Sequence, residues 1–177
     1  MALFQRNTTD HSPLIPAETL ATEQIYGTLE HAPIDPEQVL LVGSAALALY
    51  GAVLGGGMLD ANRPGDLDFV ATVEHMEDLY QQKLGYERHI PHSKSTVLRI
   101  DTPVLPIDLV SRYRGGSPTA YDEKLRRTMH AASRPLADTA FRVATPHLLQ
   151  RELRRRQHND SKARQDLIAL KVATRRH

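Results

Sequence analysis

Two aspartates separated by a single residue restrict the architecture of this chain more than any other part of its sequence. They are Asp66 and Asp68, in the run Pro-Gly-Asp-Leu-Asp-Phe-Val at residues 64–70. Side chains two residues apart on a β-strand point to the same face, so the carboxylates would lie together while Leu67 and Phe69 enter a core. The pattern predicts a strand that presents a pair of acids to a divalent cation.

A third acid has similar surroundings. Asp108 lies in an apolar run that predicts a strand over residues 104–110. Three carboxylates on two adjacent strands could hold a pair of Mg²⁺ ions, which stabilise the attacking and the leaving oxygen in phosphoryl transfer. Asp101 is a competing candidate, but it precedes Thr102-Pro103, where a role in a turn is more typical.

An apolar segment that ends in Gly-Ser precedes the acidic pair. Residues 39–42 predict a strand, and the Ala- and Leu-rich residues 45–50 favour a helix directly after it. The N-terminus of a helix binds phosphate through its unpaired N–H groups, and Gly43 would leave those groups accessible. Ser44 could cap the helix, bond a phosphate oxygen, or do both at different times.

In this order, the three elements resemble the minimal signature of the DNA polymerase β-like nucleotidyltransferase superfamily. The resemblance extends over residues 38–110. It implies transfer of a nucleoside monophosphate from a nucleoside triphosphate to a hydroxyl acceptor, with Mg²⁺ or Mn²⁺ as the metal and release of pyrophosphate. The catalytic and metal-binding residues it implies are Asp66, Asp68 and Asp108, and Gly43 and Ser44 would bind the terminal phosphates.

Arg63 is a further candidate for binding nucleotide. It precedes the acidic strand, where its guanidinium could reach a phosphate or brace Asp66. Relatives often have a threonine between this arginine and the first acid, whereas this chain has Pro64-Gly65. That difference leaves the contacts of this loop open.

The C-terminal tail contains two more candidates for nucleotide binding, Lys162 and Arg164. The tail resembles the ending of small bacterial nucleotidyltransferases, including the abortive-infection toxin branch, in which a basic residue followed by Asp-Leu closes the domain. Here Gln165 stands where a lysine is common, directly before Asp166. The basic role therefore passes to Lys162 or Arg164, or is absent.

The fold class expected is α/β (α+β), within one compact domain that 177 residues suit. The resemblance implies a nucleotidyltransferase fold with a mixed sheet of about four to five strands, flanked by helices, and a C-terminal helical segment. Residues 1–16 predict a flexible N-terminal arm, 17–115 the nucleotidyltransferase catalytic core, and 116–177 a basic, mainly helical segment packed on that core.

Apolar spacing and cap residues predict the remaining elements. The glycines at 55–57 predict a mobile connector. Tyr80 and Val172 are expected to face inward, and Ser161 is expected to cap the last helix. The other expected helices span residues 16–31, 74–84, 121–130 and 146–157, and the other expected strands span 86–90, 96–100 and 141–144.

Charge is unevenly distributed along the chain, although the formal net charge is only +1. Residues 1–123 contain 8 Lys and Arg against 17 Asp and Glu, and residues 124–177 contain 14 against 4. An acidic part that collects metal and a basic part that meets phosphates would suit an enzyme acting on nucleotides or nucleic acid. The alternative is that the arginines at 154–156 and 175–176 are a solvated helix surface.

The chain has no cysteine, which excludes disulfides, thiolate zinc sites and a cysteine nucleophile. No stretch has the length and apolar character of a membrane span or a signal peptide. A cytoplasmic protein with no membrane partner is expected.

Several readings of function remain open. A toxin-like enzyme that adds nucleotides to RNA or tRNA fits the basic C-terminal part. Nucleotidylation of a small molecule such as an antibiotic, or of a protein, fits the same signature. A non-catalytic nucleotide- or partner-binding module of a toxin–antitoxin system is a fourth reading, with a cognate antitoxin or a second copy as partner. An unrelated α/β domain is the plainest one.

Overall fold

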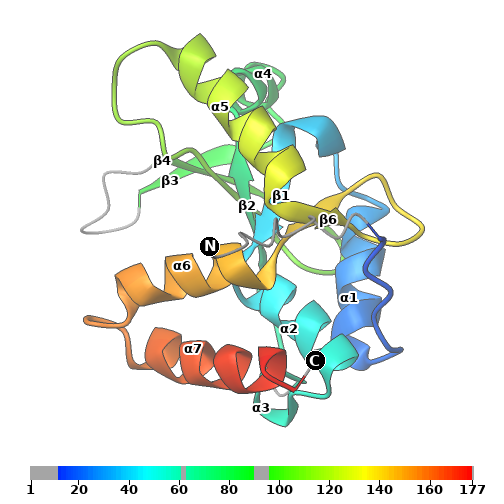
Figure 1. Cartoon of the computed structure of the whole chain (residues 1–177). Helices are drawn as coiled ribbons and strands as arrows, with labels where there is room; N and C mark the ends of the chain where they lie inside the picture. Colours follow the sequence, from blue (N-terminus) through cyan, green and yellow to red (C-terminus); the bar gives the residue numbers. More distant parts are fainter. Residues whose placement is uncertain (1–11, 61–62, 90–95, 177) are drawn as a thin grey trace.

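The computed structural model describes residues 12–60, 63–89 and 96–176. These residues form one mixed sheet with helices packed around it (Figure 1). The strands are β1 (Val39–Val42), β2 (Leu67–Ala71), β3 (Tyr86–His89), β4 (Thr96–Ile100), β5 (Ile107–Val110), β6 (Ser133–Pro135) and β7 (Arg142–Ala144). The helices are α1 (Leu20–Leu29), α2 (Gly43–Leu54), α3 (Gly57–Asp60), α4 (Val73–Gln81), α5 (Pro118–Ala131), α6 (Pro146–Arg156) and α7 (Ser161–Thr174), with a 3₁₀ turn, η1 (Pro36–Gln38).

The predicted α/β class is confirmed, but the sheet has seven strands in the described residues, more than the four to five expected. Of the two strands in the C-terminal part of the chain, β7 was expected at residues 141–144 and β6 was not. β6 is only three residues long and contains a proline, so its sequence has no strand pattern of its own. It pairs antiparallel with β7, which in turn lies parallel beside β1.

The strand order is β3-β4-β5-β2-β1-β7-β6. Central β2 pairs antiparallel with β1 and parallel with β5, so the third acidic strand lies directly beside the acid-x-acid strand, as predicted. Val42, Asp68, Asp108 and Arg99 are successive Cα partners across β1, β2, β5 and β4. Residues in register share a face of the sheet, so these four side chains project from the same surface.

The opposite face of the sheet forms the main core. Leu67 and Phe69 are both 0% exposed, as their alternation with the aspartates predicted. Leu41 of β1 and Leu109 of β5 are equally buried beside them. The period-2 pattern thus separates a dry face from one that carries charge.

Helices α5 and α6 lie over the acidic face. Leu40 and Val70 from that face line a common cavity with Tyr121 of α5 and Leu148 of α6. Helix α7 packs alongside α6, and both contact α2 (Figure 1). The basic C-terminal helices are therefore close to the acidic strands.

Residues 12–16, expected to be part of a flexible arm, contact the body of the protein. Leu14 is 2% exposed and bridges to Leu136. Its N–H donates to the Pro135 carbonyl at 2.8 Å, and its carbonyl accepts from the Ala137 N–H at 3.0 Å. Two backbone hydrogen bonds and one buried leucine hold this segment although it contains two prolines; the rest of the predicted arm, 1–11, lies outside the described residues.

Side-chain caps start several helices. Thr145 caps α6, as predicted. Helix α1 begins at a capping box formed by Thr19 with Thr22, four residues after the predicted proline start. Asp160, and not Ser161, caps α7. An Asp and a Ser in succession are both good N-caps, so the sequence alone could not choose between them.

The glycine run at 55–57 differs from the predicted connector. Gly55 ends α2 in the left-handed conformation, with φ +62°, and Gly57 opens the short helix α3. Tyr80 and Val172, expected inside, are 51% and 46% exposed. No helix within the described ranges is long and apolar enough to cross a membrane.

Asp122 of α5 links this helix to α4. Its carboxylate accepts from the N–H groups of Val73 at 2.7 Å and Glu74 at 3.1 Å, and the residue is 3% exposed. Asp122→Ala would leave these helix-terminal donors without their partner, so we expect the free energy of unfolding to fall by about 1–3 kcal/mol. Urea denaturation measures this loss. The exposed neighbour provides the control, Glu123→Ala, which should change stability by less than about 0.5 kcal/mol; equal losses would contradict the assigned role.

Candidate functional site

The three predicted acids lie close together at the ends of two neighbouring strands in the middle of the sheet. Asp68 and Asp108 are Cα partners on the parallel strands β2 and β5, and Asp66 directly precedes β2. Asp108 is 6% exposed, whereas the Asp66 side chain is 33% exposed. The cluster therefore has one acid buried in the sheet and one open to solvent.

Gly43 makes room for Asp68 beside the start of α2. A Cβ at Gly43 would collide with the Asp68 carboxylate, and Gly43 has φ +69°, a conformation that residues with side chains rarely adopt. Both constraints require glycine at this position. The acidic pair and the predicted phosphate-binding turn are consequently in contact range.

The predicted capping role of Ser44 is wrong. The N-cap of α2 is Val42, which has no side-chain cap, and Ser44 lies within the first helical turn. The glycine in the left-handed conformation starts the helix one residue before the serine. Ser44 instead lines the cavity described next.

A cavity of about 190 Å³ brings most of the predicted site residues together. Besides Gly43 and Ser44 it is lined by Asp66, Asp68 and, from α7, Lys162. The last of these is more than ninety residues away in sequence and reaches the site because α7 packs against α2. Two elements predicted separately, the strand signature and the basic tail, thus form one site.

Three predicted residues do not line this cavity: Asp108, which lies beside Asp68 on β5, and the basic residues Arg63 and Arg164. Arg63 is exposed and does not line it. Arg164 is also exposed, and its Nη2 donates to the carbonyl of Gln157 at 3.3 Å, at the turn between α6 and α7. Of the two basic candidates in α7, it is Lys162 that faces the acids.

The carboxyl of Asp68 has a strongly perturbed pKa. Burial, and then repulsion from Asp66 and Asp108, raises the pKa of Asp68 from 3.8 to about 6, while Arg156 and Lys162 oppose that rise. Repulsion among three carboxylates is what a bound cation would relieve. A perturbed acid in a cleft is also a common mark of a functional site.

Two arginines near the acids were not found from sequence. Arg99 of β4 lies 3.3 Å from Asp108 and 3.9 Å from Asp66. Arg156, at the end of α6, lines the cavity and pairs with Asp160 at 2.8 Å. An arginine between buried residues of a strand was the available signal for Arg99, and Arg156 was hidden within a run of three arginines.

The acids fit a divalent cation in part. Asp66 and Asp68 offer hard oxygen ligands on one face, and Mg²⁺ commonly takes one or two carboxylates together with water and substrate phosphates. Among the described residues, however, no three His, Cys, Asp or Glu side chains are arranged to hold one ion. Arg99 contacts both Asp66 and Asp108, so the third acid pairs with a guanidinium.

The cavity is the first of three adjacent hollows between the sheet and α5 and α6. A neighbouring hollow of about 150 Å³ shares Gly43, Asp68 and Arg156 with it, and a third, of about 290 Å³, shares Glu152 with the second. We call this row of hollows the sheet groove. Its far part is lined by three cations, Arg112, Lys124 and Arg151.

Glu152 is the acid in that far part, and it is engaged by arginines. It pairs with Arg112 at 2.7 Å and with Arg155 at 3.5 Å. The sheet groove therefore runs from an acidic end at β2 to a basic end at α5 and α6.

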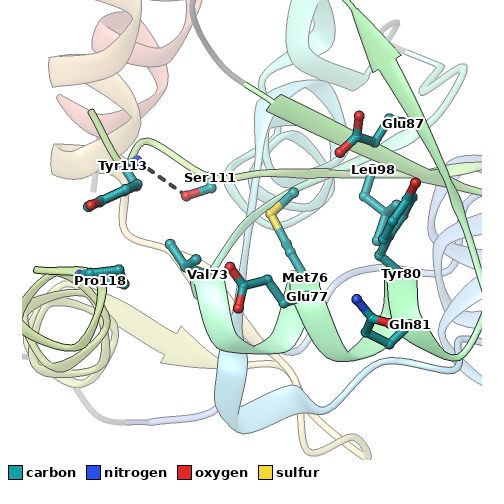
Figure 2. Close-up of a pocket in the computed structure, with 10 residues that line it drawn as sticks. All are labelled: Val73, Met76, Glu77, Tyr80, Gln81, Glu87, Leu98, Ser111, Tyr113 and Pro118. Carbon is teal, nitrogen blue, oxygen red and sulfur yellow. Dashed lines mark hydrogen bonds between the residues drawn. The ribbon is translucent and has the colours of Figure 1, made fainter. Parts of the chain in front are cut away.

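A separate cavity of about 310 Å³ contains none of the predicted residues (Figure 2). It lies between α4, β3, β4 and the segment after β5. Figure 2 shows Met76 at its centre, with the carboxylates of Glu77 and Glu87 and the ring of Tyr80 around it. This cavity is larger than the one beside the acids, but most of the predicted site residues lie in the sheet groove.

Comparisons with known proteins give little further information. No protein-family model and no curated protein matches the chain. Among solved structures it is similar to the crystal structure of the Megavirus polyadenylate synthase, with a TM-score of 0.45 and 12% identity over 93% of this chain. The chain spans 36% of the length of that protein. Likeness at this level assigns neither a family nor an activity.

Asp68 should destabilise the protein at neutral pH when no cation is bound. Between pH 3.8 and about 6 the folded state binds more protons than the unfolded chain, so stability falls as the pH rises through that range. In EDTA at pH 7 we expect Asp68→Asn to raise the free energy of unfolding by about 1–3 kcal/mol. The difference should disappear below the unfolded pKa of 3.8.

Urea denaturation across this pH range provides the measurement. The exposed Asp101 supplies a matched control, because Asp101→Asn makes the same chemical change directly after β4, outside the cluster. A gain in stability that is independent of pH, or a loss at pH 7, would contradict the prediction.

The close approach of Gly43 to Asp68 can be tested against another glycine of the same helix. Gly55 has a similar positive φ of +62° but open space around its Cβ position. We expect Gly55→Ala to cost about 1–2 kcal/mol through backbone strain alone, and Gly43→Ala to cost clearly more. Adding Asp68→Ala to the Gly43 variant should reduce that excess, as a double-mutant cycle from urea denaturation would show. Equal costs for the two glycines would contradict the contact.

Proposed function

We propose that this chain is a Mg²⁺-dependent nucleotidyltransferase that transfers a nucleoside monophosphate from a nucleoside triphosphate to a hydroxyl acceptor. The observation that carries the proposal is the meeting of Asp66, Asp68 and Asp108 beside the Gly43-Ser44 turn. Carboxylates and a helix N-terminus attract opposite charges. Their proximity suits a ligand that is itself divided between a cation and phosphates, such as a metal-bound triphosphate.

The chain's residues would divide the work of binding the triphosphate. The first turn of α2 has no side-chain cap, so its N–H groups and the Ser44 hydroxyl could bind the terminal phosphate oxygens. Lys162, which lines the same cavity from α7, would supply a positive charge to the same phosphates. When bound, the cation would neutralise phosphate charge and make the acceptor hydroxyl more acidic.

Asp108 is the proposed general base. The acceptor oxygen would form a bond to the α-phosphorus while the bond to the β-phosphate oxygen breaks, so pyrophosphate leaves and the hydroxyl proton passes to a carboxylate. Asp108 suits this role because β2–β5 pairing holds it beside Asp68 on the face that the sheet groove follows. Most of the rate would come from holding the reactants in line and from charge neutralisation.

RNA, including tRNA, is the proposed acceptor. The sheet groove leaves the acids toward Arg112, Lys124 and Arg151, and cations along such a path suit a sugar–phosphate chain. A cationic small molecule such as an aminoglycoside would be repelled by the same residues. Cytoplasmic location, the toxin role and a cognate antitoxin or homodimer stay predictions.

Label transfer tests the proposal directly. Each α-labelled nucleoside triphosphate in turn would be incubated with the protein, Mg²⁺ or Mn²⁺, and either total RNA or cell extract. We expect label to enter RNA, and Asp66→Ala/Asp68→Ala to abolish transfer, because the variant loses the carboxylates that receive the metal-bound triphosphate. Asp108→Asn should reduce transfer by at least about a hundredfold, the usual contribution of a general base.

The control for Asp108→Asn is Asp101→Asn, which should retain full transfer. Label that enters protein instead of RNA would overturn the acceptor assignment while keeping the transferase. Triphosphate binding without transfer to RNA, protein or added small molecules would favour the non-catalytic module. No binding at all would contradict the proposed function.

A further inference from the structure

Arg99 lies within the acidic cluster. It is the Cα partner of Asp108, which is in turn the partner of Asp68, so one cation and two acids form a row across three strands. Its neighbours Leu98 and Ile100 are 1% and 2% exposed on the opposite face, which fixes the direction of the arginine side chain. The register of β4 against β5 thus aims a positive charge at the proposed metal site.

The guanidinium of Arg99 spans the first and the third acid. Nη1 donates to Asp108 Oδ2 at 3.3 Å, and Nη2 is 3.9 Å from Asp66 Oδ2. The Arg99 side chain is only 16% exposed. Both contacts are longer than the 2.7–2.9 Å typical of charge-assisted hydrogen bonds, so Arg99 holds neither carboxylate tightly.

We propose that Arg99 is the resident counter-cation of the cluster and competes with the divalent metal for Asp66 and Asp108. With the guanidinium between them, these acids cannot share an ion, which agrees with the lack of a three-acid metal group in the described residues. A cation that engages both acids must displace Arg99. Arg99 therefore sets the affinity of the site for the metal. It does so by positioning Asp108 and is not itself a catalytic residue. This inference rests on the proposed function.

The position of Arg99 has a physical reason, which is the repulsion among the three acids. Asp66, Asp68 and Asp108 would repel one another if no cation were present, and this repulsion adds to burial in raising the pKa of Asp68. Arg99 neutralises part of this charge inside the fold, so the sheet forms without metal. A metal that arrives with a triphosphate brings phosphate oxygens, which offer the displaced guanidinium a new partner.

Metal binding without nucleotide tests the competition, measured by Mn²⁺ electron paramagnetic resonance and by calorimetry. Arg99→Met removes the charge at similar side-chain length, and we expect it to bind Mn²⁺ about tenfold more tightly than the unaltered protein, because a unit charge this close in a half-buried site opposes a cation strongly. Arg99→Lys keeps the charge and should bind within about threefold of the unaltered protein. Arg164→Met is the control for net charge and should bind unchanged, since Arg164 does not line the cavity.

A second measurement uses the unaltered protein and does not depend on a variant that folds. The Arg99 Nε–H resonance, assigned by through-bond experiments on the unaltered protein, should shift on Mg²⁺ addition with the same midpoint as metal binding. The inference would be overturned if a folded Arg99→Met variant bound Mn²⁺ no more tightly than the unaltered protein. It would also be overturned if the Nε–H resonance did not shift when Mg²⁺ binds. If Asp66→Ala/Asp68→Ala binds Mn²⁺ as well as the unaltered protein does, the proposed function fails instead.

Discussion

The register of four strands is the constraint from which the site follows. β2 pairs with β1 and β5, and β5 with β4, so that Val42, Asp68, Asp108 and Arg99 stand in one row. A shift of one residue in any of these pairings would turn a charged side chain into the core and a buried leucine or isoleucine out of it. The apolar side chains on the far face therefore hold the register, and the register in turn places the charges.

The same arrangement places like charges close together at the site where the chemistry is proposed, and their repulsion is unfavourable. Three carboxylates share one end of the acidic face, and the carboxyl of Asp68 responds with a raised pKa. Cations from three different elements offset this cost: Arg99 from β4, Arg156 from α6 and Lys162 from α7. Functional sites commonly retain such local conflicts while the rest of the fold supplies the stability.

Local pattern was sufficient to predict the acidic strands and their neighbours but not the contacts between distant elements. The alternation around Asp68 and the apolar run around Asp108 carry their own strand signals, and both strands form, although β5 begins at Ile107 instead of residue 104 and β2 begins one residue after Asp66. Arg99 has no comparable signal in the sequence, because its position beside Asp108 depends on how β4 pairs with β5. Leu14 was missed for the same reason, since it is held by backbone bonds to residues more than a hundred positions away.

The uneven charge along the chain becomes a gradient in space once the C-terminal helices fold back. Helix α7 brings Lys162 to the acids, while α6 places Arg151 over the far part of the sheet groove. A sequence acidic in its first part and basic in its last thus yields one surface with both signs in a defined order. Under the proposed function, a metal-bound triphosphate would occupy the acidic end and a polyanion the basic end, so the gradient would orient the two substrates toward each other.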